Sequence, residues 1–233
     1  MILTMISANE IQKHFTPNAI LKKLYKVLLA LIKFFDDNNI AYCAISSTLL
    51  GAYRHKSFIP WDHDVDLALF DSGVVHRSDF KQLKLGMQMR KFPNLMIYQI
   101  CAKLKNNNTE RCDRPNIDLH FYELQPSGIF KFQDHSVKNS RWDSYITEFK
   151  FTDIFPMRKM PFAGTYIYTP KIGNKYLDQQ YDEWNSHLRI HRVYDSKYKK
   201  FRYLKEPIRV KPKKNTPIDK LFRKTITFNY ANN

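Results

Sequence analysis

Residues 46–69 read SSTLLGAYRHKSFIPWDHDVDLAL, and the acidic end of this stretch decides how the chain is interpreted. Asp62, Asp64 and Asp66 stand at alternate positions in an otherwise apolar run. Alternate side chains of a strand share one face, so a strand over residues 64–70 would place Asp64 and Asp66 together. Two such charges about 4 Å apart repel by roughly 4 kcal/mol at an effective dielectric near 20. The pattern therefore predicts a counter-ion at this face.

The residue types favour a divalent hard cation, Mg²⁺ or Mn²⁺, as that counter-ion. Such ions take oxygen ligands, and Mg²⁺ in particular binds through one or two carboxylates together with substrate phosphates. The alternative is a solvated turn over residues 62–64, in which case only Asp66 begins the strand. An isolated run of alternating acids does not distinguish these two interpretations.

A second strand-like run, NIDLHFY at residues 116–122, carries the single acid Asp118. Its apolar neighbours make an unpaired charge costly to bury. If the two strands are neighbours, Asp118 converges on Asp64 and Asp66, next to a serine-containing helix start that can offer backbone N–H groups to a phosphate. This arrangement predicts a site of phosphoryl or nucleotidyl transfer. Alternatively, Asp118 is a solvated acid at a strand end.

Hydrophobic periodicity predicts a mixture of helices and strands. Thr16 and Pro17 have the chemistry of a helix N-cap and first turn, and apolar residues recur at three- and four-residue steps over residues 20–35. Further helices are expected over residues 46–53, 79–91 and 172–184, and strands over residues 40–45, 64–70, 95–101, 116–123 and 128–133. The fold class predicted is α+β, with a mixed sheet flanked by helices.

Composition limits the class of protein. The 233 residues are 43% hydrophobic and 26% charged, which excludes a disordered or low-complexity chain. A net charge of +16 suggests polyanions, anionic lipid or phosphorylated ligands as partners. Residues 189–224 hold 14 of the Lys and Arg residues and only three acids. We therefore expect one domain over residues 1–188 and a basic C-terminal tail over residues 189–233, which either contacts RNA or an anionic membrane or is a solvated surface.

Location is expected to be cytoplasmic by default. The first residues lack the basic segment of a secretory signal, and no apolar run reaches the roughly 18–20 residues of a transmembrane segment. The three cysteines, Cys43, Cys101 and Cys112, have no metal-binding or framework spacing. That pattern favours a reducing compartment or unpaired core thiols over disulfides.

At residues 46–69 the sequence resembles the signature of the LicD/fukutin-related family. Thr48-Leu-Leu-Gly51, Arg54-His55, Phe58-Ile-Pro-Trp-Asp62, Asp64 and Asp66 all match that pattern. A second block of the family is similar to the stretch from Phe155 to Gly164 and the prolines and tyrosines that follow it. The resemblance covers about residues 17–187 and leaves the basic tail unmatched.

This resemblance implies a nucleotidyltransferase-like fold and a phosphotransferase activity. The family moves a phospho-alcohol, such as phosphocholine or ribitol phosphate, from a CDP-activated donor to a sugar hydroxyl of a glycan or glycolipid, and CMP is released. Two other functions stay open. One is a nucleotidyltransferase acting on RNA, which the basic charge favours, and the other is an inactive member that binds a glycan or nucleic acid.

Site residues can be carried over onto the matching positions. The resemblance implies that Asp64, Asp66 and Asp118 are the metal ligands and that these three and Asp62 are catalytic, with Asp62 beside the ion or acting as base. The residues expected to bind substrate are Ser47, Thr48, Arg54, His55, Lys56 and Trp61. Arg54, His55 and Lys56 would hold donor phosphates, although Lys56 also fits a solvated surface lysine.

Three positions carry a specific alternative. Trp61 would either stack on the donor base or attach its loop to the core. Ser47 replaces the glycine that the family usually has before Thr-Leu-Leu, so its effect depends on whether that position needs a positive φ. His63 is a variable position of the pattern and is expected to be an exposed loop histidine.

Overall fold

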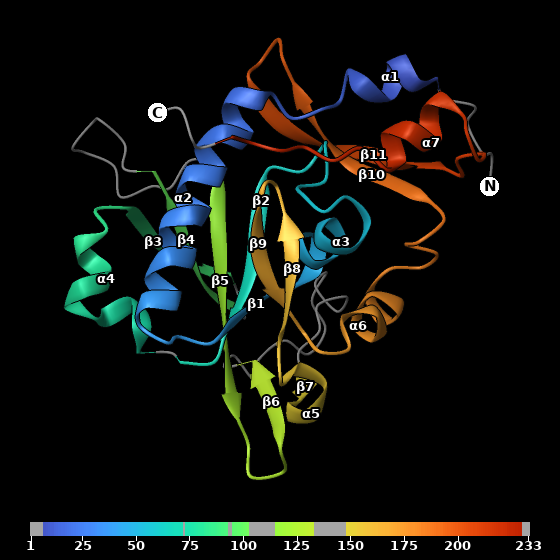
Figure 1. The fold of residues 1–233 in the computed structure, drawn as a ribbon. Helices are drawn as coiled ribbons and strands as arrows, with labels where there is room; N and C mark the ends of the chain where they lie inside the picture. Colours follow the sequence, from blue (N-terminus) through green and yellow to red (C-terminus); the bar gives the residue numbers. More distant parts are fainter. Residues whose placement is uncertain (1–6, 72, 93–94, 103–114, 133–147, 230–233) are drawn as a thin grey trace.

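The computed structural model describes residues 7–71, 73–92, 95–102, 115–132 and 148–229, in which helices and two hairpins surround a mixed sheet (Figure 1). The helices are α1 (Ala8–Gln12), α2 (Asn18–Asp37), α3 (Ser46–Arg54), the 3₁₀ turn η1 (Val74–His76), α4 (Ser78–Gln82), α5 (Phe151–Ile154), α6 (Gly173–Gln180) and α7 (Pro217–Phe222). The strands are β1 (Tyr42–Ala44), β2 (Asp64–Leu69), β3 (Gly86–Phe92), β4 (Leu95–Cys101), β5 (Asn116–Leu124), β6 (Ile129–Phe132), β7 (Glu148–Lys150), β8 (Arg158–Phe162), β9 (Thr165–Thr169), β10 (Leu188–Asp195) and β11 (Lys200–Val210). The predicted α+β class, with a mixed sheet flanked by helices, is confirmed.

The central sheet has the strand order β1-β2-β5-β4-β3, and β6 and β7 continue it from the far half of β5. All neighbouring pairs are antiparallel except β2 and β5, which are parallel. A parallel pair needs a long crossover, and here the crossover contains η1, α4, β3 and β4. Both strands are apolar on their buried sides, so their acidic residues are exceptions within a hydrophobic sheet.

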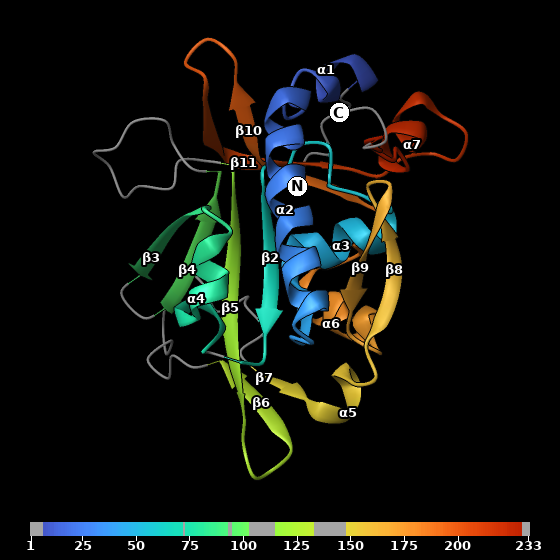
Figure 2. The same ribbon diagram turned by 60° about the vertical axis from the view of Figure 1, so that its left-hand side comes forward.

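Helix α2 lies across one face of the sheet, against β2, β4 and β5 (Figure 2). Its buried side chains recur at the expected helical spacing and include Leu24, Leu28 and Leu31. The predicted cap is wrong, because Pro17 is the N-cap and Thr16 donates its hydroxyl to the carbonyl of Asp62 at 2.6 Å. The start of this helix therefore holds the acidic loop in place.

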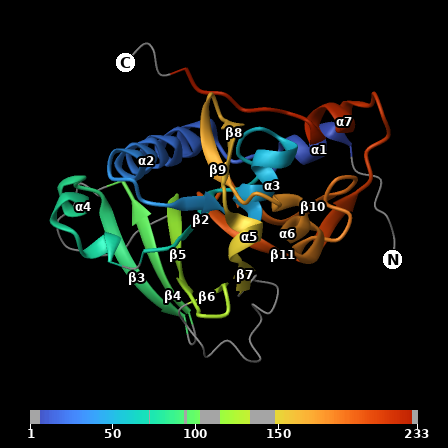
Figure 3. The same ribbon diagram turned by 60° about the horizontal axis from the view of Figure 1, so that its bottom comes forward.

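Helix α3 connects β1 to β2 and packs closely on the loop that follows it. A Cβ on Gly51 would meet the carbonyl oxygen of Ser57 at 2.5 Å, so only glycine fits this position without a backbone shift. Helix α6 lies beside α3 (Figure 3), and a Cβ on Gly173 would contact the Tyr53 ring at 2.9–3.1 Å. These approaches set α3 against the loop that follows it and against α6.

The helix predicted over residues 79–91 is wrong in its second half. α4 ends at Gln82, and residues 86–92 form β3, paired along its whole length with β4. Local helix propensity is weak there, and cross-strand pairing decides the structure. The proline-rich residues 155–170 likewise contain the β8–β9 hairpin.

The segment expected as a basic tail is folded against the rest of the protein. β10 and β11 pair in an antiparallel hairpin, with an irregular register between Ile190 and Arg192. Ile190, Val193 and Phe222 are buried in the common core. The expectation of a solvated extension is therefore corrected, because apolar residues alternate with the lysines and arginines. The division of the chain at residue 188 stays a prediction.

The cysteines differ from expectation. Cys43 is a free, buried thiol, whereas Cys101 is disulfide-bonded. Cys112 lies outside the described residues. The expectation of unpaired thiols is thus wrong for Cys101, and cysteine usage no longer favours a reducing compartment. Across the described part of the chain, no helix combines the length and apolar character that a transmembrane segment requires.

Candidate active site

Asp66 and Asp118 lie directly opposite each other on the parallel strands β2 and β5. Asp64 is in register with Asn116 one step earlier, and Ala68 with His120 one step later. Residues in register on adjacent strands project on the same face, so Asp64, Asp66 and Asp118 share one side of the sheet. The convergence expected for these three acids is therefore present, although their roles stay predictions.

Asp66 is almost fully buried and is held from both sides. Its carboxylate lies 3.4 Å from the Ser47 hydroxyl and 3.3 Å from Nε2 of His120. Its backbone N–H donates to the Thr48 hydroxyl at 2.8 Å. Ser47 and Thr48 thus lie beside the acid, and their expected role in binding substrate stays a prediction. The positive φ that glycine would favour occurs one residue earlier, at Ser46 (φ 49°).

Asp118 accepts two amide hydrogen bonds. Nε2 of Gln99 on β4 donates to its carboxylate at 2.9 Å, and Nδ2 of Asn116 donates to the same oxygen. Burial and the charge of Asp66 raise the pKa of Asp118 to about 6, while His120 and the two amides act in the opposite direction. The carboxylate is therefore held in one orientation but carries its charge at an energetic cost.

Asp62, His63 and Asp64 form a compact group at the start of β2. One ligand atom from each lies within 4.8 Å of the others. His63 is fully buried, and its ring lies 4.0 Å from that of Phe201, so the expectation of an exposed loop histidine is wrong. The solvated-turn alternative fails for the same reason. This burial depends on β11, about 140 residues later in the chain, and no local pattern indicates it.

Arg192 of β10 reaches this group from the C-terminal hairpin. Its Nη1 donates to Asp64 Oδ2 at 3.1 Å and lies 2.9 Å from Nε2 of His63. Tyr203 of β11 accepts from Nη2 and places its ring 4.5 Å below the guanidinium. No pattern in the sequence distinguishes Arg192, because it is one of many cations in the basic segment.

The acids perturb one another strongly. Burial and the charges of Asp62, Asp66 and Asp118 raise the pKa of Asp64 well above its usual range, and Arg192 only partly opposes them. Burial also acts to raise the pKa of Asp62, but hydrogen bonding and charge from His63 hold it below its ordinary value. Burial and the charges of Asp66, Asp62 and Asp64 raise the pKa of Tyr181, which follows α6 and faces the same cluster.

This donor set fits a divalent cation. Its members on β2 and β5 are carboxylates, which are the ligands that Mg²⁺ and Mn²⁺ take. Their mutual repulsion raises two of their pKa values, and a cation among them would remove that repulsion. Asp64, Asp66 and Asp118 could hold the ion from two strands, and Asp64 also belongs to the tighter group with Asp62 and His63.

The remaining residues expected at substrate have structural contacts. Nη1 of Arg54 donates to the carbonyls of Trp184 and His187 at 3.2 and 3.3 Å, and its guanidinium lies 5.0 Å from the Phe222 ring. Lys56 is exposed and donates to the Tyr53 carbonyl. Trp61 is buried against Phe15, as its structural alternative has it. In the described part of the chain, no side-chain hydrogen bond or ion pair joins these three residues to the site acids.

A family model for the LicD/FKTN/FKRP nucleotidyltransferase domain matches residues 39–172, which include the acids of β2 and β5. The chain belongs to this LicD/FKTN/FKRP family. The match ends before the C-terminal hairpin, so Arg192 lies outside the matched part.

Individual relatives of this LicD/FKTN/FKRP member are distant. An uncharacterized protein of Rickettsia typhi is 30% identical over 175 residues, which are 72% of this chain and 48% of the relative. The human ribitol 5-phosphate transferase FKRP is 20% identical over 73% of this chain and 33% of its own length. The lipopolysaccharide cholinephosphotransferase LicD of Haemophilus influenzae is 33% identical over 66 residues, 27% of this chain and 23% of its own length. The chain therefore spans less than half of each of these relatives.

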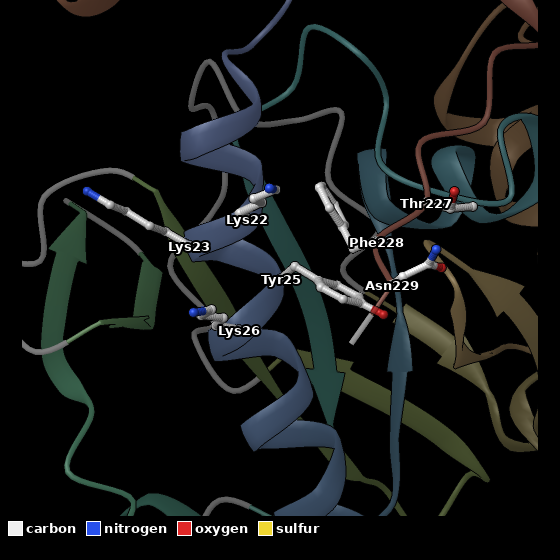
Figure 4. A pocket seen from close by; sticks show the side chains of 7 residues that line it. All are labelled: Lys22, Lys23, Tyr25, Lys26, Thr227, Phe228 and Asn229. Carbon is white, nitrogen blue, oxygen red and sulfur yellow. The ribbon is translucent and has the colours of Figure 1, made fainter. Parts of the chain in front are cut away.

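A pocket of about 350 Å³ lies elsewhere in this LicD/FKTN/FKRP chain, between α2 and the C-terminal residues 227–229 (Figure 4). Tyr25 and Phe228 line it, together with Lys22, Lys23 and Lys26, and none of the site acids does. The three lysine side chains point in different directions, so they do not converge on one anion.

His55 is the family-motif residue whose position departs most from expectation. Its ring is fully buried, Nδ1–H donates to the Lys224 carbonyl at 3.0 Å, and Nε2 accepts from Arg54 Nε at 2.9 Å. Both nitrogens are thus engaged, and neither is available to a donor phosphate. The motif histidine instead joins α3 to the C-terminal segment.

We expect the neutral state of His55 to make stability depend on pH. Burial, reinforced by the charge of Arg54, lowers its pKa to about 3. Because the unfolded chain then binds more protons at this histidine, the contribution of His55 to the free energy of unfolding should fall by about 1.4 kcal/mol per pH unit as pH drops from 6.5 towards 3, and it is fully present above 6.5. Urea unfolding at several pH values measures this slope. A His55→Gln variant should lose it, and an equal slope in both proteins would contradict the assignment.

Proposed function

We propose that this chain is a phosphotransferase that moves a phospho-alcohol from a CDP-activated donor to a sugar hydroxyl of a glycan or glycolipid. The observation that supports it most is the pairing of Asp66 with Asp118 across β2 and β5, with Asp64 on the same face. Two relatives carry the names of a ribitol 5-phosphate transferase and a cholinephosphotransferase, which support transfer of a substituted phosphate at the level of the family.

Asp64, Asp66 and Asp118 are the residues that would hold Mg²⁺ or Mn²⁺. Such an ion, when bound, neutralises charge on the donor diphosphate and on the leaving CMP. Ser47 lies beside Asp66 and also lowers the pKa of Asp62 by a hydrogen bond, so it orients the carboxylates from the start of α3. Gln99 and Asn116 orient the carboxylate of Asp118 by their amide hydrogen bonds.

The chemistry left to the chain is proton removal and orientation. A site carboxylate accepts the proton of the acceptor hydroxyl, and Asp62 is the candidate because it is not one of the three proposed ion ligands and its lowered pKa keeps it ionised. The hydroxyl oxygen forms a bond to the phosphorus of the phospho-alcohol. The bond from that phosphorus to the bridging oxygen of the diphosphate breaks, and CMP leaves with the electron pair.

The proposal predicts release of CMP that depends on a carbohydrate acceptor. The protein is incubated with CDP-choline or CDP-ribitol, Mg²⁺ or Mn²⁺ and a panel of glycans, and CMP is quantified with and without EDTA. At a donor concentration of 100 times Kd, bound donor should stabilise the fold by about 2.7 kcal/mol, and the melting temperature should rise by roughly 5–10 °C.

Other outcomes distinguish the alternatives. Nucleotide incorporation into RNA, without glycan-dependent CMP release, would replace this function by RNA nucleotidyl transfer. Binding of a glycan or RNA without turnover of any nucleotide would identify an inactive binding protein. Full activity in EDTA would refute the role of the cation and leave the transfer itself in place.

A further inference from the structure

Arg192 is the cation that the fold places on the acidic cluster. Among the described residues, it is the only Lys or Arg that forms an ion pair with Asp62, Asp64, Asp66 or Asp118. It comes from β10, outside the part of the chain matched by the family model. The C-terminal hairpin therefore contributes a charged group to a site otherwise built from β2, β5 and α3.

The Arg192 guanidinium is held by Tyr203, but one of its N–H groups has no hydrogen-bond acceptor among the described residues. Tyr203 contacts it with both its hydroxyl and its ring, while Nη1 faces Asp64. Its Nε is buried and has no hydrogen-bond partner in the described part of the chain. An unsatisfied buried donor is costly, so a group selected only for stability would be expected to use all its N–H groups. A phosphate beside Asp64 would offer the missing oxygen acceptors.

The charge of Asp64 attracts both Arg192 and a divalent cation. Arg192 partly offsets the repulsion that Asp62, Asp66 and Asp118 impose on Asp64. A divalent cation at the same carboxylates would offset it more fully. Two cations cannot both stay close to one carboxylate without repelling each other, so the guanidinium and the ion compete for Asp64.

We propose that Arg192 is the internal counter-ion of this site and a ligand of the donor diphosphate. Without ligands it pairs with Asp64. When the divalent cation takes Asp64, the guanidinium remains anchored on Tyr203 and binds a phosphate oxygen of the donor. This inference rests on the proposed function for the identity of the diphosphate, but the competition for Asp64 does not.

The test measures two affinities that should change in opposite directions. Mn²⁺ alone is titrated into the wild type and into Arg192→Met, and loss of the competing cation should tighten Mn²⁺ binding by roughly tenfold. CDP and UDP are then titrated at saturating Mn²⁺. Loss of a charge-assisted phosphate contact should weaken their binding by roughly tenfold to a hundredfold. A purely structural arginine would weaken both or neither.

Arg202→Met is the matched control. Arg202 lies on the same hairpin, pairs with Asp195 at 3.3 Å and is more than half exposed, so its loss removes the same charge away from the acids. Both of its affinities should stay within about twofold of wild type. Arg192→Lys keeps the charge without the fork, so its Mn²⁺ affinity should stay near wild type while CDP binding falls. Melting curves of all variants verify folding.

The failures of the two proposals are distinguishable. Wild-type binding of UDP but not CDP removes the cytidine donor and leaves the role of Arg192 intact. Unchanged Mn²⁺ or nucleotide affinity in folded Arg192→Met overturns the inference while the transfer activity can stand. Absence of nucleotide binding in the wild type overturns both. If Arg192→Met does not fold, the uncharged polar variant Arg192→Gln decides by its nucleotide affinity, and wild-type values there refute the phosphate contact.

Discussion

Replacing Asp66 with Asn should abolish phosphotransfer without destabilising the metal-free protein. Asp66 lies between the other two acids of the proposed ion site, in register with Asp118. Loss of about 4 kcal/mol of transition-state stabilisation corresponds to a rate about 10³-fold lower. The repulsion that Asp66 imposes on Asp64 and Asp118 disappears at the same time. We therefore expect the melting temperature to be unchanged or up to about 4 °C higher.

The control for this variant is Asp37→Asn. Asp37 lies at the end of α2, more than half exposed, and pairs with Lys33 on the surface. The substitution removes the same charge, so activity and melting temperature should both stay near wild type. A normal turnover rate in Asp66→Asn would refute its role at the ion. A fall of several degrees in its melting temperature would show instead that His120 and Ser47 need the charge for folding.

Removing the chain after Leu188 should unfold the domain. The C-terminal segment buries Ile190, Val193 and Phe222 in the common core, and its backbone accepts hydrogen bonds from His55 and Ser57. At about 1.5–3 kcal/mol for each buried apolar side chain, these three alone contribute about 5–9 kcal/mol, which is comparable to the whole stability of a domain. Far- and near-UV circular dichroism should show loss of fixed structure.

A pair of point variants compares a buried aromatic ring of this segment with an exposed one. Phe222→Ala removes a buried ring that contacts Arg54 and should cost about 3–5 kcal/mol. Tyr198→Ala removes an aromatic ring of the same segment that is 61% exposed, and its effect should be within about 0.5 kcal/mol. Urea unfolding measures the free energy of unfolding of both variants.

The truncation has an outcome that would contradict this expectation. A protein truncated after Leu188 that folds and releases CMP would restore the interpretation of the segment as a separate tail.

Local periodicity was sufficient for much of the fold. The three- and four-residue spacing before residue 36 predicted α2, and alternation predicted β2 and β5 within one or two residues. It failed at β3, where pairing with β4 outweighs helix propensity, and at β10 and β11, where the lysines and arginines hid the alternation of apolar residues. In each failure the partner strand supplied information that the segment lacks.

The motif residues of the candidate site fall into two groups, those that lie at the acids and those that pack behind them. The motif residues Ser47 and Thr48 and the acids lie together, and Arg54, His55 and Trp61 belong to the packing behind them. Pattern matching does not separate these two groups, since a motif is maintained equally by chemistry and by folding. His120 could have been found, because it follows Asp118 by two residues and so shares its face.

The shared face of Asp64 and Asp66, and the cost of burying Asp118 alone, follow from the order of the amino acids, because side-chain alternation and the desolvation of charge are local properties. Three other features depend on the folded chain: β2 and β5 are parallel neighbours, His63 is buried under Phe201, and Arg192 pairs with Asp64. These contacts join segments roughly 50 to 140 residues apart. Such contacts depend on how the whole core closes, which no short pattern encodes.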